Sequence, residues 1–162
     1  MLIPKELESK ILTELTAALS AVVSADELAR KCTLTGSWQP SASGLVKWLT
    51  AETVNPVHVH VAVGTALPRT FTSGDVDFNV VISLYIRTDL DTTGELQLAY
   101  AEKIENLLRG WQAATYQQAL AALSLQDEFY AGDVQGMSGD PPKTQDNISV
   151  ISWPLVIGGS YA

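Results

Sequence analysis

The sequence has little of what common binding and catalytic sites require. Cys32 is the single cysteine among 162 residues, which excludes an internal disulfide and a thiolate-rich metal site. Ten Lys and Arg residues stand against 18 Asp and Glu residues, for a net charge of −8, and the basic residues are scattered singly. A nucleic-acid binder needs a clustered basic surface, so we expect no specific nucleic-acid partner.

Long hydrophobic runs are also missing. The sequence has no stretch of about 18 consecutive apolar residues, the minimum for a membrane-spanning helix, and no basic amphipathic helix that would favour a membrane surface. The first residues, Met1 to Glu6, lack the charged-then-apolar layout of a signal peptide. We therefore expect a protein made in the cytoplasm that binds no membrane.

Charged residues make up only 17% of the chain, whereas apolar residues make up 46%. The length suits one domain, and this apolar content can build one core, so residues 1–162 are expected to form a single domain. The low charge has two readings. Either extra surface is buried against partner proteins, or a large core is simply coated by uncharged polar residues.

The chain is organised around the stretch from Asp75 to Trp111. Its first part alternates strictly, which predicts a long strand with one buried and one wet face. Thr92 and Glu95 then have the spacing of a capping box, and the following apolar spacing predicts a central helix over 93–109, ended by Gly110. The inward set of the strand is Val76, Phe78, Val80, Ile82, Leu84 and Ile86.

The flanking segments predict the remaining elements. We expect N-terminal helices within 1–32, an irregular segment over 33–54, and a sheet with its central helix over 55–162. The expected pieces are helix 4–23, a short helix from Ser24 to near Cys32, strand 57–63, a connecting arm 65–74, a possible helix 112–125, strand 129–137, a mobile loop 138–147 and strand 148–157.

Two irregularities are expected in the last strand. Its phase slips between Val150 and Ile151, which suggests a bulge, and Pro154 suggests an edge position.

The predicted fold class is α+β, with a four-stranded, mostly antiparallel sheet and helices packed on one face. The predicted element order is α(α)ββαββ.

His58 and His60 form the strongest candidate metal site. They lie two residues apart on one predicted strand, so both imidazoles project from the same face, and Asp77 on the next strand could add a carboxylate ligand. Two imidazoles alone make no site, and the favoured reading is two polar residues on a solvent-facing or subunit-facing side. A small metal-binding or enzymatic module using His58 and His60 remains the alternative function.

Two other motifs are rejected, and no cofactor is expected. Asp89–Gly94 begins like a calcium loop, but Tyr100 occupies the position of the required glutamate. Gly139–Thr144 weakly imitates a phosphate loop, but Pro142 stands before the lysine and has no amide hydrogen. No nucleophile–base–acid arrangement suggests itself, so we expect a protein that is not an enzyme.

The overall plan resembles a family of tailed-bacteriophage virion proteins, the tail terminators and head–tail joining (minor tail) proteins. The resemblance lies in the N-terminal helix, a first strand with a long connection over 57–74, the unit "DVDFNVVISLYIRTDLDTTGELQLAYAEKIENLLRGW" and the closing strand "NISVISWPLVIGG". It covers most of the chain but includes no diagnostic motif.

The resemblance implies a structural subunit that forms a homo-oligomeric ring, commonly of six copies. Such a ring docks on phage tail-tube or head-completion proteins, in the tail or neck of a virion assembled in the bacterial cytoplasm. Rings use heterologous contacts between two different patches. The expected contact residues are Arg69, Phe71, Val81, Tyr85 and Arg87. A monomeric domain that binds a ligand between its sheet and helix is a third possibility.

Overall fold

The computed structural model describes residues 3–20, 32–38, 48, 55–68, 74–113, 121–125, 128–136, 139 and 142–161. The helix expected after Ser24 lies outside these residues, as does half of the possible helix over 112–125, namely 114–120. Nine elements are present in this part of the chain. They are α1 (Ile3–Ser20), β1 (Cys32–Gly36), β2 (Val57–Val63), β3 (Leu67–Pro68), β4 (Asp75–Arg87), α4 (Glu95–Ala113), β5 (Phe129–Gln135), β6 (Lys143–Gln145) and β7 (Ile148–Tyr161).

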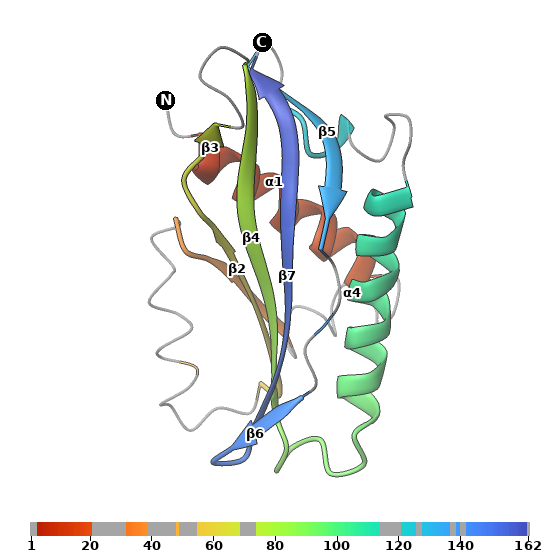
Figure 1. Cartoon of the computed structure of the whole chain (residues 1–162). Helices are drawn as coiled ribbons and strands as arrows, with labels where there is room; N and C mark the ends of the chain where they lie inside the picture. Colours follow the sequence, from red (N-terminus) through yellow and green to blue (C-terminus); the bar gives the residue numbers. More distant parts are fainter. Residues whose placement is uncertain are drawn as a thin grey trace.

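The described strands form one seven-stranded mixed sheet with the central order β1-β2-β4-β7-β5. β3 also pairs with β4, and β6 also pairs with β7. The long strands β4 and β7 lie side by side at the centre, α1 crosses behind the sheet, and α4 runs along its β5 side (Figure 1). The prediction of a four-stranded, mostly antiparallel sheet in the order α(α)ββαββ is therefore wrong.

Three short strands account for this error. β1 falls in the segment expected to be irregular, and it pairs with β2 in parallel from Cys32↔Val57 to Gly36↔Val61. β3 forms from the start of the expected 65–74 arm and pairs back on β4. Each has five residues or fewer, too few for the alternation of polar and apolar residues to distinguish a strand from a loop.

The third short strand, β6, falls in the segment expected to be a mobile loop. It forms a hairpin with β7, closed by Asp146 and Asn147 at φ values of 51° and 63°. Two positive φ values in a two-residue loop define the type I′ turn, whose twist matches that of the flanking strands. Asp and Asn tolerate this conformation better than most residues, which explains why this turn forms without glycine.

The last strand is longer and more regular than its sequence indicates. β7 pairs with β4 without interruption from Ile148↔Arg87 to Ser160↔Asp75, so the predicted bulge near Val150 is absent. The bulge lies in β5 instead, between Ala131 and Asp133. β7 is also no edge strand, since β4 and β5 flank it.

Pro154 is accommodated in this central strand because its β5 neighbour has already ended. The pairing between β5 and β7 stops at Gln135↔Val156. The Pro154 carbonyl oxygen faces Gly136, 3.8 Å from where a side-chain carbon of Gly136 would lie. The backbone of Pro154 therefore points toward the end of β5, where a missing N–H removes no ladder bond.

The core lies between the sheet and the two described helices. The even-numbered residues of β4 face it, and α1 and α4 each bury one apolar stripe against it. The largest wholly buried side chains include Trp111, Trp153, Tyr100, Phe78 and Phe129. Trp111 explains why α4 continues past Gly110: the helix carries this indole into the core before it ends at Ala113.

Asp91, and not the predicted capping box, caps α4. Its carboxylate accepts hydrogen bonds from the backbone N–H groups of Leu96, at 3.1 Å, and Gln97, at 3.0 Å. A carboxylate in this place satisfies two donors that have no partner within the helix and complements the positive end of the helix dipole. Gly94, at a φ of 76°, supplies the turn that brings Asp91 back to the helix start.

Glu8 joins α1 to the end of β1, although it is fully buried. Its carboxylate accepts hydrogen bonds from the Ser37 hydroxyl, at 2.8 Å, and from the Trp38 backbone N–H, at 2.9 Å. Gly36 leaves room for it, because a side-chain carbon there would overlap the carboxylate. Burial raises the pKa of the Glu8 carboxyl, and the hydrogen bonds from Trp38 and Ser37 partly oppose that rise.

Candidate functional site on the helix-free face

The sheet face opposite the helices holds most of the residues that the sequence marks as candidates. On β4 it carries the odd-numbered residues, and the strand registers place His58 beside Tyr85, His60 beside Ser83, and Ala62 beside Val81. We call this surface the helix-free face, because neither α1 nor α4 lies on it, although the helical residue Trp48 does. It divides into a covered part around the two histidines and an open part over β4, β7 and β5.

The two histidines meet at one hydroxyl group in the covered part. The Oγ1 atom of Thr35 lies 2.7 Å from His58 Nε2 and 2.7 Å from His60 Nδ1. A hydroxyl can donate to one partner but accept from two, so at least one of the two imidazoles must donate to Thr35. Both rings are therefore satisfied at these atoms when both are neutral.

Trp48 covers the His58 ring. Its ring centroid lies 5.4 Å from that of His58 and 6.3 Å from that of Tyr85, and the His58 and Tyr85 rings meet edge-on at 6.3 Å. The Trp48 indole N–H donates to the Asn55 carbonyl oxygen at 3.0 Å. We call Trp48, His58 and Tyr85 the aromatic cluster; it leaves His58 with no exposed surface.

This burial shifts the titration of both histidines. Burial lowers the pKa of His58 from 6.5 to about 4, with a smaller contribution from the neighbouring His60. Burial also lowers the pKa of His60. Both shifts have the sign expected when an imidazolium loses water, so both rings are neutral at pH 7.

The metal ligands proposed from the sequence do not come together. Asp77 pairs with Leu67 and Gly158, six residues along β4 from the Ser83 position beside His60, which is roughly 20 Å at strand spacing. Within the described part of the chain, no three His, Cys, Asp or Glu side chains are grouped to hold a metal ion. Burial raises the pKa of the Cys32 thiol to about 12, so this thiol stays protonated at neutral pH.

The open part of the face is slightly hollow and carries exposed apolar side chains among polar ones, which are Asp75, Asp77 and Asn79 of β4. Val81 is 39% exposed, and a shallow hollow beside it is lined by Asn79, Gly136, Pro154 and Val156 among others. Two larger side chains on the same face stand out into solvent, Leu67 at 50% and Tyr130 at 51% exposed. Through the strand registers, Leu67 lies level with Asp77 and Tyr130 level with Asp75, so these apolar side chains are spread along the face rather than joined in one patch.

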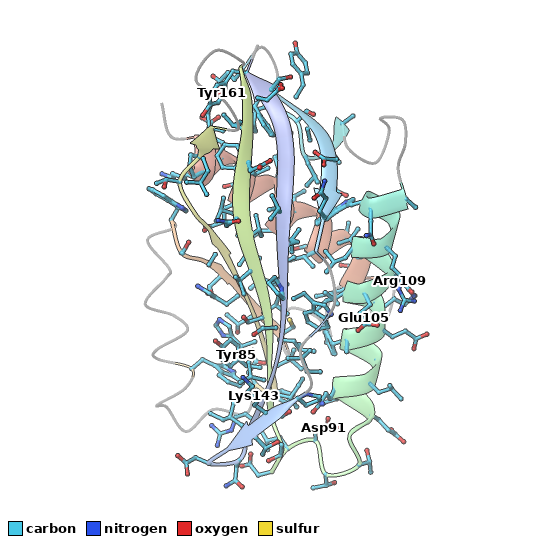
Figure 2. The ribbon with its side chains drawn as sticks, in the orientation of Figure 1. Tyr85, Asp91, Glu105, Arg109, Lys143 and Tyr161 are labelled. Carbon is cyan, nitrogen blue, oxygen red and sulfur yellow. The ribbon has the colours of Figure 1, made fainter. Side chains whose placement is uncertain are left out.

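The predicted contact residues fall in different places. Arg69 and Phe71 lie outside the described residues. Val81 is in the open part, whereas Tyr85 is half-buried in the aromatic cluster. Figure 2 places Tyr85 and Lys143 toward the β6 end of the sheet and Tyr161 at the opposite end. Arg87 lies near that β6 end and pairs with Asp89 at 3.4 Å.

Three residues that matter here are not identified by the sequence: Thr35, Trp48 and Glu8. Thr35 becomes a partner of the histidines only through the parallel pairing of β1 with β2. Trp48 belongs to a segment with no periodicity, so its docking site cannot be deduced. A glutamate between Leu7 and Ile11 on a helix was a detectable signal for Glu8, because it falls on the buried stripe.

The other candidate sites in the described part of the chain provide weaker evidence for a function. The Ser83 and Ser152 hydroxyls lie 3.1 Å apart on the helix-free face, a cross-strand pair without an acid or base attached. The space between helices and sheet is filled by the buried core, and the hollows found among the described residues lie at the surface. No helix of the described chain is long and apolar enough to cross a membrane.

Comparison with known proteins adds little to this picture. No protein-family model matches the sequence, and no curated protein matches it significantly. One solved structure, whose name states no function, aligns over 93% of this chain and 94% of its own, at 13% identity and a TM-score of 0.37. That score is too low to support an inference about fold or function.

Proposed function

We propose that this protein is a structural subunit of a tailed-phage virion, which forms a ring of identical copies. In this proposal the ring terminates the tail or joins it to the head, docks on tail-tube or head-completion proteins, and catalyses no reaction. The open part of the helix-free face is one of the two different patches by which neighbouring copies meet.

The observation that carries the proposal is the exposed apolar group on a face left free by the described helices. Val81, Leu67 and Tyr130 are 39–51% exposed there, and Pro154 adds a rigid apolar surface beside Val81. Interface centres are depleted in charge and enriched in aromatic residues, which fits this group. A second copy of the chain is the partner that needs no further assumption.

The chemistry of the histidines also supports a non-enzymatic role. Each ring uses one nitrogen in a hydrogen bond with Thr35, and His58 has no exposed surface through which a substrate could reach it. The low charged fraction of the sequence points the same way, since it leaves uncharged surface available for contact with protein.

The Val81→Lys variant tests the self-association. In a heterologous contact the lysine would be buried without a partner charge, so we expect the association constant to fall roughly tenfold or more. Leu98→Lys is the matched control, because Leu98 is 69% exposed on α4, outside the helix-free face. Mass photometry and electron microscopy of the purified variants measure the number of copies and show closed rings.

Two outcomes would contradict the proposal. One is a wild-type chain that stays monomeric at every concentration, with Val81→Lys indistinguishable from it. The other is an assembly that Leu98→Lys disrupts as strongly as Val81→Lys, because the contact would then not lie on the helix-free face.

A further inference from the structure

The second nitrogen of the buried His58 ring has no hydrogen-bond partner. Nε2 is bonded to Thr35, whereas Nδ1 is buried and meets no donor or acceptor in the described structure. Leaving a buried N–H donor unpaired costs more than leaving an aromatic nitrogen lone pair among apolar groups. We therefore assign the neutral tautomer with hydrogen on Nε2, so that His58 donates to Thr35 and leaves the Thr35 hydrogen available to Nδ1 of His60.

Protonation breaks this arrangement at one atom. An added proton must go to His58 Nδ1, because Nε2 already carries a hydrogen. It would create a cationic N–H group in a buried place without an acceptor, which is among the least favourable states a side chain can occupy. The groups facing His58 offer no compensation. They are His60 from β2, Thr33 and Thr35 from β1, Tyr85 from β4 and the Trp48 ring.

The nearest charges along β4 do not help either. Arg87 lies two residues beyond Tyr85 and is itself cationic. The nearby carboxylate of Asp89 already forms an ion pair with Arg87. His60, once protonated, adds a like charge beside His58. Protonated His58 must therefore reach water.

Trp48 is the side chain that can give way. His58 lies in β2, which is paired on both sides by β1 and β4, so the strand cannot move without breaking two ladders. Among the described residues, Trp48 contacts this face through the His58 and Tyr85 rings and through one indole hydrogen bond to Asn55. We propose that the contact between Trp48 and His58 is a proton-operated latch, in which protonation of His58 releases the Trp48 indole from the helix-free face.

Opening the latch adds surface next to the proposed contact patch. Tyr85 and His58 lie on the same face as Val81, four residues along β4 from it, or about 13 Å. Acid therefore extends the exposed apolar part of the face over β2 and β4. The inference stands on the contacts of His58 alone and does not require that the protein self-associates.

Nuclear magnetic resonance of the whole protein from pH 8 to pH 4 tests the latch. The chain has two histidines, and His60→Asn assigns their ring signals. Trp48→Phe identifies the Trp48 indole among four tryptophans. We expect the His58 ring to titrate well below an ordinary histidine. Over the same pH range the Trp48 indole N–H signal should shift and lose its protection from exchange, while the amides of β4 and β7 stay in place.

His58→Phe is the matched variant, since it keeps a ring under Trp48 but cannot be protonated. We expect its Trp48 signal to stay unchanged down to pH 4. The latch is overturned if the wild-type Trp48 signal does not move while His58 titrates, or if it moves only as the amides of β4 and β7 collapse. Loss of Trp48 protection at the same pH in His58→Phe also overturns it. Should His58→Phe not fold, the wild-type titration alone decides between these outcomes.

Discussion

Single buried polar side chains hold the ends of several elements of this protein. Asp91 closes the start of α4, Glu8 ties α1 to the residues after β1, and Thr35 bridges the two histidines. Each is paired, as a polar group removed from water must be. Each also joins residues that are not adjacent in sequence, so its loss affects the packing of one element on another.

Replacing Asp91 by alanine should destabilise the protein by about 1–2 kcal/mol, because two N–H groups of α4 lose their acceptor. Thr92→Ala is the control, since the capping box suggested by the sequence would place the cap at Thr92. We expect it to change the free energy of unfolding by less than about 0.5 kcal/mol. Urea denaturation measures both changes. A larger loss of unfolding free energy in Thr92→Ala than in Asp91→Ala would show that the predicted capping box caps α4.

Sequence periodicity identifies some elements far better than others. The strand from Val76 and the helix after it are correctly placed, because each is long enough for its own period to show. β1, β3 and β6 are missed, because strands of two to five residues have no measurable period. Their existence depends on β2, β4 and β7, which offer them hydrogen-bonding partners.

Gly110, three residues before the end of α4 at Ala113, tests where this helix ends. Gly110 is not among the residues with positive φ, and a side-chain carbon there would meet nothing within 4 Å. Gly110→Ala should therefore stabilise the protein by about 0.5–1 kcal/mol, the usual gain in a helix interior.

Thermal or urea unfolding of Gly110→Ala checks this value. If α4 ended at Gly110 in a left-handed cap, as the sequence suggests, the same change would destabilise the protein. Gly159→Ala is the contrasting variant, because a side-chain carbon at Gly159 would collide with the Tyr130 carbonyl and the Phe129 ring. We expect it to be clearly destabilising.

At the scale of the whole molecule, the sheet separates two environments. One face is closed by the described helices over a continuous core, and the other is part covered, part open. The two histidines lie on the second face yet are largely withdrawn from water. Global stability should therefore depend on pH through these rings.

Stability should fall as the pH drops below about 6.5. His58 is protonated near its ordinary pKa of 6.5 in the unfolded chain but only near 4 in the folded one. Between these values the unfolded state binds more protons. The contribution of the neutral, buried His58 ring to stability is therefore complete above pH 6.5 and is lost toward pH 4. The loss is at most ~3 kcal/mol, with a slope of up to ~1.4 kcal/mol per pH unit.

Urea denaturation at a series of pH values between 8 and 5 measures that slope. His58→Phe should flatten it, and because His60 is also shifted downward, His60→Asn should flatten it by a smaller amount. An unchanged slope in His58→Phe would show that the acid sensitivity arises elsewhere, in groups other than this imidazole.

The sequence by itself determined the long strand–helix unit from Asp75 to Arg109 and which face of each part is buried, because these depend on periods within one stretch of chain. It also identified His58 and His60 as neighbours on one face. Only the tertiary structure decided that β1 runs parallel to β2, that Thr35 joins the histidines, and that Trp48 covers His58. An alternating strand can pair with any other, and the choice of partner follows from how the whole core packs.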